Sequence, residues 1–428
     1  MLVLGLGKSG VASLEVLKKL GAEIWVSEIK DGPFFRDLAA RLEGKGIKVE
    51  LGRHSEEFVA GKDLIVVSPG VPSHLSFLKR AKERGIPVIG EIELGYLLSA
   101  SPIIAVTGTN GKSTVTTLIG KVLEKAGIPN IVCGNIGNPF TGELEKLNRR
   151  VYTVLEISSF QLENIVSFRP WIGVVLNITP DHLDRYRSFR EYVEAKERIF
   201  LNQNSEDYLV LNYGDEVVRK FADKAKSKII FFNEPGEKKD LTENQKVVLK
   251  VCSLMGISEE TAFSVFQSFS GLPHRCEFVT EIEGVKFIND SKATNIHSTR
   301  YSLTSFREKV ILIAGGRDKG QDFTGIREWL RDKVKYLLLI GEGAEKIEKA
   351  VGDSLPLGRF THLEEAVDYA YSIAQKGDIV LLSPMCASFD MFEDYAHRGL
   401  VFKEKVLELK KKTEILSGHL VIPAQTVT

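Results

Sequence analysis

One stretch in the first third of the chain combines the residue types that hold a nucleoside triphosphate. Residues 107–114 read Thr-Gly-Thr-Asn-Gly-Lys-Ser-Thr; they follow an apolar run and precede a helical pattern. In such a loop, backbone N–H groups and the helix dipole hold phosphate oxygens, a lysine offsets phosphate charge, and a serine ligates Mg²⁺. Val106 replaces the first glycine of the strict phosphate-loop pattern. We still predict ATP binding by Gly108, Thr109, Asn110, Gly111, Lys112, Ser113 and Thr114.

Three later residues are candidates for metal binding or catalysis. Glu156 ends the apolar run VYTVL, and a nucleotide-binding sheet places a Mg²⁺ partner at such a strand end. His182 follows another strand, in the run NITPDHLDRY, and is either a metal ligand or a turn residue. Lys196 lies in the helical stretch EYVEAKERIF, and spacing alone predicts only a solvated lysine there.

A second glycine motif opens the chain. Gly5, Gly7 and Gly10 match G-x-G-x-x-G after a short apolar run, and Glu28 ends the next strand-like run. This spacing is typical of a nicotinamide dinucleotide site, where glycines let the backbone approach a diphosphate. The physical requirement is only a diphosphate and a ribose, which a UDP-sugar also presents. A purely structural glycine turn is the alternative.

Polar clusters in the last third of the chain follow further apolar runs. GLPHR (271–275) is beside a predicted hinge, and NDSKATN, GGRDK and SPMCAS follow strand-like runs near residues 289, 315 and 383. Open α/β sheets bind ligands at the carboxyl ends of their strands. Three such clusters in one domain favour ligand binding over coincidental loops, although each alone is a weak signal. For GLPHR, packing at the hinge is the alternative.

These motifs need an α/β scaffold, and the sequence predicts one. Short apolar runs alternate with amphipathic stretches along most of the chain, which is typical of parallel, doubly wound sheets. This alternation of apolar runs and amphipathic stretches is lost over residues 94–101. A helical region at 243–268 ends before Gly271. We expect a Rossmann-like domain at 1–98, a central P-loop-type mononucleotide-binding domain at 99–271, and a Rossmann-like domain at 272–428.

Composition limits the classes of partner. The chain has 428 residues, 27% charged residues and a formal net charge of +0, which gives no general attraction to nucleic acid or anionic membranes. No apolar run is long enough to span a bilayer, and the N-terminus reads as a buried first strand rather than a signal peptide. Four scattered cysteines indicate neither disulfides nor a zinc site. A reducing cytoplasm fits best.

Taken together, the motifs resemble those of the Mur ligase family. The matching runs are TGTNGKST, GNIGNP, LEISSFQLE, LNITPDHLDRY, GLPHR, NDSKATN and SPMCASFDMF, and they extend over essentially the whole chain. NDSKATN discriminates best, since sibling ligases often carry histidine there. The resemblance is closest to members that join D-glutamate to UDP-N-acetylmuramoyl-L-alanine in the cytoplasmic stage of peptidoglycan synthesis. It implies a monomer that uses ATP to form an acyl phosphate, which the amine of D-glutamate attacks.

The resemblance also implies roles for single residues. It assigns ATP phosphates to Lys112, one Mg²⁺ to Ser113 and Glu156, and a second Mg²⁺ to His182 and Lys196, the lysine carrying a carbamate. The adenosine part of ATP would contact Asn244, Arg275 and Asp290. The UDP-substrate would contact Lys8, Ser9, Glu28, Gly70 and Asn135. The incoming glutamate would contact Thr294, Lys319, Ser388 and Tyr395.

Three alternatives remain open from the sequence. A nicotinamide-dependent oxidoreductase would explain residues 5–10 but leaves the phosphate loop without a role. A nucleotide-switch binding module would use the loop without ligase chemistry. Another Mur ligase or a folylpolyglutamate synthase would share most motifs, and NDSKATN argues against it.

Overall fold

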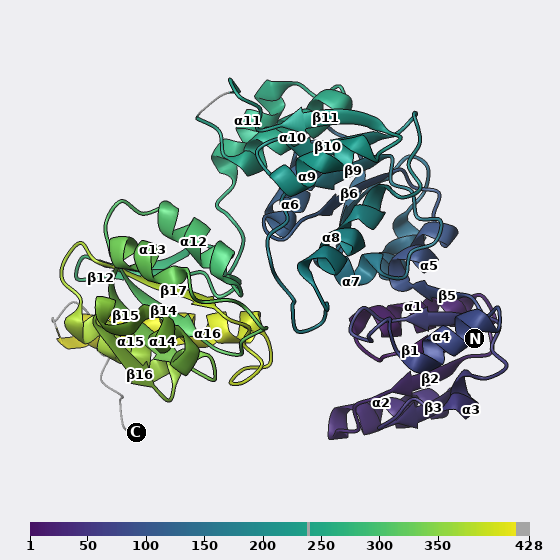
Figure 1. Cartoon of the computed structure of the whole chain (residues 1–428), viewed down its shortest axis with the longest axis horizontal. Coiled ribbons are helices and arrows are strands. Elements are labelled where there is room, and N and C mark those ends of the chain that lie inside the picture. The colour runs from purple at the N-terminus through teal and green to yellow at the C-terminus, as the bar shows by residue number, and fades with distance from the viewer. Residues whose placement is uncertain (238–239, 417–428) are drawn as a thin grey trace, which may run out of the picture. The chain divides into compact units, whose positions relative to one another are not determined.

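The computed structural model describes residues 1–237 and 240–416 and contains three separate β-sheets (Figure 1). By its internal contacts the chain divides into two compact units. The first holds Met1–Ile178 and Arg185–Phe269, with two of the sheets; the second holds Thr179–Asp184 and the chain from Ser270 onward, with the third sheet. The predicted α/β class is confirmed, while the predicted boundaries near Ser99 and Gly271 stay predictions.

The N-terminal sheet is parallel and has the order β3-β2-β1-β4-β5. Its strands are β1 Leu2–Leu4, β2 Trp25–Glu28, β3 Lys48–Leu51, β4 Ile65–Val67 and β5 Val88–Gly90. The helices are α1 Lys8–Lys19, α2 Pro33–Glu43, α3 Glu56–Val59, α4 Ser76–Glu83 and α5 Glu91–Leu98. One apolar cluster joins α1, α2 and α5 to one face, and another joins α3 and α4 to the opposite face. Because the strand order reverses beside β1, the loops after β1 and β4 flank the crevice where such sheets bind ligands.

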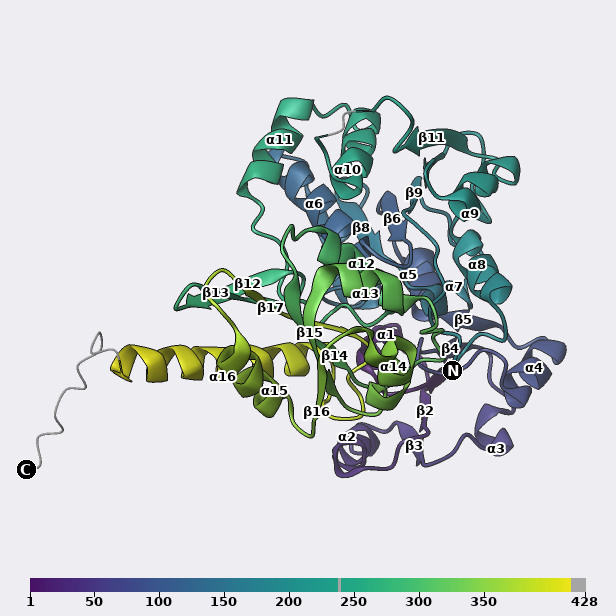
Figure 2. The same cartoon turned by 60° about the vertical axis from the view of Figure 1, so that its left-hand side comes forward.

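The central sheet is also parallel, with the order β11-β10-β9-β6-β8-β7. Its strands are β6 Ile103–Thr107, β7 Asn130–Gly134, β8 Tyr152–Glu156, β9 Ile172–Val175, β10 Tyr208–Asn212 and β11 Lys228–Phe232. Its helices are α6 Lys112–Lys125, α7 Ser159–Leu162, α8 Phe189–Glu197, α9 Glu216–Arg219, α10 Glu243–Leu254 and α11 Glu259–Ser268, with short 3₁₀ turns η1 Phe140–Lys146, η2 Arg198–Phe200 and η3 Lys220–Asp223. Figure 2 shows α6, α10 and α11 on one side of this sheet and α7, α8 and α9 on the other, as their apolar clusters require.

The third sheet has the order β12-β13-β17-β14-β15-β16 and is parallel except for the hairpin strand β12 at one edge. Its strands are β12 Glu277–Ile282, β13 Val285–Asn289, β14 Val310–Gly315, β15 Val334–Ile340, β16 Leu357–Phe360 and β17 Ile379–Met385. Its helices are α12 Ile296–Thr304, α13 Ile326–Lys333, α14 Ala344–Val351, α15 Leu363–Ile373 and α16 Tyr395–Leu416, with the 3₁₀ turn η4 Gly352–Ser354. Helices α12, α13 and α14 cover one face; α15 and α16 cover the other.

The structure adds detail to two local predictions. Residues 94–101, where the sequence rhythm is lost, begin within α5, whose C-cap is Ser99. The single helical region predicted at 243–268 is two helices, because Gly256 turns the chain with φ +68° between α10 and α11. A positive φ favours glycine and ends a right-handed helix. Among the described residues, no helix combines the length and hydropathy that a membrane span requires.

Two buried glutamates of α5 fasten the N-terminal sheet to the central domain. Glu93 accepts hydrogen bonds from the backbone N–H groups of Val166 (2.8 Å), Ser167 (2.8 Å) and Phe168 (2.9 Å). Glu91 accepts from the N–H and the hydroxyl of Thr141, at 2.6 and 2.8 Å, but its Oε2 has no partner among the described residues. Burial raises the pKa of Glu91 to about 7. The carboxyl of Glu91 is thus held in a place that suits its protonated form.

This environment predicts a pH-dependent stability. The folded-state pKa of Glu91 lies above its unfolded value, so its contribution is fully present below about pH 4.5 and is lost as pH rises to about 7. Glu91→Gln, which resembles the protonated acid, should therefore gain stability over the unchanged chain across that window, by up to about 3 kcal/mol. Urea midpoints of both proteins between pH 4.5 and 8 measure the gap. A gap that stays constant with pH contradicts the prediction.

Candidate active site

The phosphate loop lies between the end of β6 and the start of α6, as the sequence predicts. Gly108 has φ +153° and Gly111, the N-cap of α6, has φ +84°. A Cβ added at Gly111 would come within 2.8 Å of the side-chain oxygen of Asn244, which starts on α10. The loop therefore needs glycine at Gly111 for its backbone angle and for the space that Asn244 occupies. Its N–H groups lie at a helix N-terminus, where anions are favoured.

Two lysine side chains converge on one carbonyl oxygen of this loop. Lys112 Nζ donates to the carbonyls of Gly108 and Thr109, both at 2.8 Å, and Lys196 Nζ donates to the same Gly108 oxygen at 2.8 Å. Lys196 is 1% exposed, whereas Lys112 is half-buried. The expectation of a solvated lysine from spacing is therefore wrong, while the metal-binding role that the resemblance implies for Lys196 stays a prediction.

Lys196 is buried because of its place on α8. Tyr192, one helical turn earlier, is 1% exposed and its hydroxyl lies 3.1 Å from the hydroxyl of Thr109. Lys196 Nζ lies 4.8 Å from the centre of the Tyr192 ring. Residues four apart share one face of a helix, and this face of α8 packs on the central sheet beside Ala195 and Ile199. The lysine stem is accordingly in the core and its amine is at the phosphate loop.

The segment after β9 braces the loop from the side. The carbonyl of Asn177 accepts the N–H of Thr109 at 2.8 Å, and its side-chain oxygen accepts the N–H of Asn110 at 2.8 Å. The side-chain amide of Asn177 returns a bond to the Asn110 carbonyl at 3.2 Å. Three hydrogen bonds from one residue hold the tip of the loop in a fixed shape.

Glu156 ends β8, the strand next to β6, and its carboxylate is partly unsatisfied. The side chain is 1% exposed; Oε1 accepts a hydrogen bond from Asn135 Nδ2 at 2.8 Å, and Oε2 has no partner in the described structure. A buried carboxylate oxygen without a donor is costly unless a cation pairs with it. Glu156 is therefore suited to hold Mg²⁺, with the buried hydroxyl residue Ser113 at the start of α6.

Four of the five residues predicted for the UDP-substrate lie around the carboxyl end of β1 in the N-terminal sheet. Lys8 and Ser9 start α1. Glu28 is 6% exposed and accepts the backbone N–H of Leu6 at 2.6 Å, so it shapes the glycine loop itself. A Cβ at Gly10 would lie 1.9 Å from the carbonyl oxygen of Gly5.

Gly70, the last of the four, follows β4. Its loop is tied to the glycine loop because the hydroxyl of Ser68 donates to the carbonyl of Gly5 at 3.0 Å. Two backbone loops thus flank the crevice beside β1.

In the second unit, the polar clusters predicted at strand ends do converge. Their strands β13, β17 and β14 are neighbours in the sheet. Asp290, 4% exposed, accepts from the hydroxyls of Ser302 (2.6 Å) and Ser383 (2.8 Å). Arg317 and Ala387 exchange two backbone hydrogen bonds of 2.9 Å. Burial raises the pKa of Asp290 to about 6.

Arg398, which the sequence interpretation missed, joins two of these clusters. It is 0% exposed, and its guanidinium donates to the hydroxyl and carbonyl of Ser291 (2.9 and 2.8 Å), to Cys386 O (3.2 Å) and to Ala387 O (3.2 Å). Burial lowers its pKa to about 10, which leaves it charged at neutral pH.

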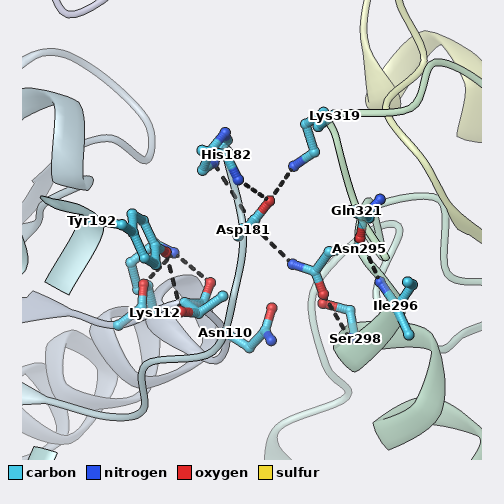
Figure 3. A network of polar contacts seen from close by, with 12 residues as sticks. Asn110, Lys112, Asp181, His182, Tyr192, Asn295, Ile296, Ser298, Lys319 and Gln321 are labelled. Atoms are coloured by element: carbon cyan, nitrogen blue, oxygen red, sulfur yellow. Dashed lines mark hydrogen bonds and ion pairs between the residues drawn. The ribbon is translucent and has the colours of Figure 1, made fainter. Parts of the chain in front are cut away.

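Asp181 forms a buried ionic contact in this unit. Figure 3 shows its carboxylate between Lys319 Nζ, at 2.6 Å, and Asn295 Nδ2, at 2.9 Å. Burial opposes ionisation of Asp181, but the Lys319 ammonium, followed by His182, lowers its pKa to about 2. His182 adjoins the pair with φ +56° and Nε2 3.8 Å from the carboxylate. Lys319, predicted to bind an amino acid, thus contacts a carboxylate in this structure.

The remaining predicted residues of this unit lie near the same clusters. Thr294 precedes α12, Ser388 is 2% exposed, and Tyr395 begins α16 with Lys292 Nζ 5.0 Å from its ring centre. Arg275 is half-buried between two residues of positive φ, His274 and Cys276.

Four residues with evident roles were not predicted: Asn177, Asp181, Arg185 and Arg398. Three of them fall in LNITPDHLDRY, the run whose only predicted site residue was His182. A polar run directly after a buried strand was the available signal, whereas nothing in α16 distinguishes Arg398 from its solvated neighbours.

Known proteins include relatives that match almost the whole chain. The chain is 40% identical to the UDP-N-acetylmuramoylalanine–D-glutamate ligase of Caldanaerobacter subterraneus, with 96% of the chain and 98% of that protein covered. The ligases of the same name from Koribacter versatilis and Clostridioides difficile are also 40% identical, with the same coverage.

Similar solved structures share the fold at lower identity. They include the pseudomurein peptide ligase type C of Methanothermus fervidus (TM-score 0.59, 18% identical, 96% of this chain and 100% of that chain) and the UDP-N-acetylmuramate-alanine ligase of Thermotoga maritima (TM-score 0.57, 18% identical, 96% and 99%). The MurD-like N-terminal, middle and glutamate ligase domains of Mur ligases match residues 1–90, 106–269 and 274–386. With its three domains accounted for and near full-length relatives at this identity, the chain belongs to the Mur ligase family.

Proposed function

We propose that this protein is an ATP-dependent ligase that joins D-glutamate to UDP-N-acetylmuramoyl-L-alanine and releases ADP and phosphate. The observation that carries the reaction class is the phosphate loop with Lys112, beside a strand that ends in the partly unsatisfied Glu156. The substrates are supported by the relatives named as D-glutamate ligases, which match almost the whole chain. The reaction belongs to peptidoglycan synthesis, and we place it in the cytoplasm, carried out by a monomer.

The chemistry follows from the poor reactivity of a carboxylate. An oxygen of the alanyl carboxylate attacks the γ-phosphorus of ATP, the bond to the bridging oxygen breaks, and ADP leaves. The amine of D-glutamate then attacks the acyl carbon, loses a proton, and expels inorganic phosphate to leave an amide. Both steps bring negatively charged groups together, so fixed positive charge and aligned N–H groups lower the barrier.

Lys112 and the loop N–H groups supply that charge for the triphosphate. Lys112 Nζ now rests on two loop carbonyls at 2.8 Å, which keeps it at the α6 N-terminus where phosphates would bind. Asn244 beside Gly111, with Arg275 and Asp290, would receive the adenosine part.

The family's Mg²⁺ fits the carboxylate and hydroxyl present here. Glu156, with its partnerless buried oxygen, and Ser113 would hold one ion. When bound, Mg²⁺ neutralises phosphate charge and orients the transferred group. We propose a second ion at His182 and a carbamylated Lys196.

A carbamate on Lys196 has an electrostatic rationale in the loop geometry. The amines of Lys112 and Lys196 share the Gly108 oxygen, so the two nitrogens are separated by at most twice the 2.8 Å hydrogen-bond length. Two ammonium groups that close repel each other, and burial raises the cost. Carbamylation replaces the Lys196 cation by an anion that attracts Lys112 and offers oxygen ligands to Mg²⁺.

The two remaining substrates have separate binding groups. The crevice beside β1 would hold the UDP part through Lys8, Ser9, Glu28 and Gly70, with Asn135 reaching the muramoyl part from the central domain. Thr294, Lys319, Ser388 and Tyr395 would hold D-glutamate. Lys319 Nζ donates to the carboxylate of Asp181 at 2.6 Å, and it would donate in the same way to a carboxylate of the amino acid.

The substrate assignment predicts the outcome of a phosphate-release screen. UDP-N-acetylmuramoyl-L-alanine, ATP and Mg²⁺ should release phosphate with D-glutamate and at least about 100-fold more slowly with neutral amino acids or L-glutamate. A neutral side chain lacks the carboxylate that pairs with a buried lysine, and L-glutamate cannot place its amine and both carboxylates in the same positions at once. The control omits the UDP-linked acceptor. Release that needs no acceptor, or that prefers another amino acid, overturns the assignment.

Lys112→Ala should lower ligation by at least about 100-fold while binding of the UDP-linked acceptor changes little, because only the triphosphate loses its charged partner. Steady-state phosphate release and calorimetric titration with the acceptor measure the two effects. Lys121→Ala, an exposed lysine of the same helix, is the matched control and should stay active. Near-normal turnover of Lys112→Ala refutes the phosphate role.

The carbamate proposal predicts that Lys196→Ala is inactive and that short carboxylates such as acetate or propionate partly restore turnover. In the unchanged protein, ¹³C-bicarbonate should give a carbamate resonance that Lys196→Ala lacks. Lys226→Ala, an exposed lysine of the same unit, should behave as the unchanged protein. A fully active Lys196→Ala, or a labelled resonance that survives the substitution, counts against the carbamate.

A further inference from the structure

Arg185 has an anchored position in the central domain. Its side chain is 14% exposed and donates through Nε and Nη2 to the carboxylate of Glu163, at 3.2 and 2.9 Å. Its guanidinium also lies 4.2 Å from the centre of the Phe160 ring. Glu163 follows α7 and is held in turn by the hydroxyl of Tyr186 at 2.8 Å. Arginine in a forked carboxylate pair over an aromatic ring has little freedom to turn.

The same guanidinium reaches into the N-terminal domain, which lies in the same compact unit. Nη1 donates to the carbonyl of Pro69 at 2.9 Å, and Nη2 donates to the carbonyl of Val71 at 3.2 Å. Nη1 also lies 3.5 Å from the carbonyl of Gly70. All of these acceptors belong to the loop after β4, so one side chain of the central domain fixes the carbonyls of this loop.

Because a peptide group is planar, holding the carbonyl of one residue also sets the direction of the N–H of the next residue. The carbonyl of Pro69 and the N–H of Gly70 belong to one planar trans peptide and point in opposite directions. Because the Pro69 oxygen faces Arg185, the Gly70 N–H faces away from it. Gly70 is exposed, and a Cβ built on it meets no atom within 4 Å. This N–H therefore belongs to an exposed residue of the loop that flanks the β1 crevice, and it points away from Arg185.

We propose that Arg185 is a positioning residue for the UDP-linked acceptor: it orients the Gly70 N–H to donate a hydrogen bond to an anionic oxygen of that substrate. The inference rests on the proposed function, because the UDP-substrate gives the loop its ligand. Arg185 does not touch the substrate in this account. It acts through the Pro69–Gly70 peptide, and the Glu163 carboxylate keeps the guanidinium in place and compensates its charge.

The test is a comparison of Michaelis constants in the full-length protein. Arg185→Lys keeps the charge but cannot pair with Glu163 and donate to two loop carbonyls at once. The KM for the acceptor should rise about 10-fold in Arg185→Lys and further in Arg185→Ala, while KM for ATP and kcat change less than about twofold. Arg169→Lys, which alters a similar pair with Asp207 in the same unit, should leave all three constants unchanged.

A double-mutant cycle with Gly70 separates orientation from general packing. Gly70→Ala has room in the structure, so it should fold normally and raise the acceptor KM by crowding the approach of the ligand. If Arg185 acts through this peptide, the effects of Arg185→Lys and Gly70→Ala on the acceptor KM should be less than multiplicative. Multiplicative effects indicate independent action and overturn the inference.

Two further outcomes overturn it without affecting the proposed function. One is an unchanged acceptor KM in Arg185→Lys, and the other is an equal rise of the acceptor and ATP constants, which a merely structural role produces. If the unchanged protein ligates no D-glutamate to the acceptor, it is the proposed function that fails. Should Arg185→Ala not fold, as thermal unfolding would show, the lysine variant still decides between these outcomes.

Discussion

The site depends on one carbonyl oxygen, that of Gly108, which receives two lysine ammonium groups. Holding like charges that close together is unfavourable, and it persists only because the surrounding structure fixes each partner. Helix α8 brings Lys196 in from the core side, and the start of α6 brings Lys112 from the other. Lys112 therefore lies at the helix N-terminus where a triphosphate would bind, and the proposed carbamate on Lys196 would relieve the repulsion without removing the Lys112 cation.

A negative charge that complements the lysines lies at the end of β8, the strand next to β6. Glu156, at the end of β8, presents a buried oxygen without a partner, while Asn135 fixes its other oxygen. The parallel register of β6 and β8 pairs Val106 with Glu156, so the phosphate loop and the carboxylate emerge at the same edge of the sheet. The pairing of β6 with β8 therefore sets the distance between the lysine-bearing phosphate loop and the carboxylate of Glu156. Lys112 and Glu156 are placed by the backbone of the sheet, which is a rigid support for a binding site.

Sequence reasoning succeeded where local chemistry and strand rhythm coincide. Residues 107–114, Glu156 and the strand-end clusters lie as predicted, because glycine loops and polar strand ends are visible in one dimension. Only the family resemblance identified Lys196 as a site residue. It is buried because it lies on the face of α8 that packs on the sheet, and its spacing in the sequence did not indicate this. The short strands β3, β12 and β16 lie at sheet edges and carry mixed polar residues, so their apolar signal is weak. Arg398 and Arg185 donate hydrogen bonds to backbone carbonyl groups, and no pattern of side chains in the sequence reveals such bonds.

The segment that follows β9 shows why such residues matter together. Asn177 braces the phosphate loop, Asp181 pairs with Lys319, and Arg185 holds the loop that carries Gly70. The chain passes from the first unit into the second at Thr179 and returns at Arg185. A run of nine residues is thereby bonded to the predicted binding groups for ATP, for the amino acid and for the UDP-linked acceptor. Each of the three bonds restrains its own group, so one short segment that follows a buried strand supplies a positioning contact to each of the three predicted binding sites.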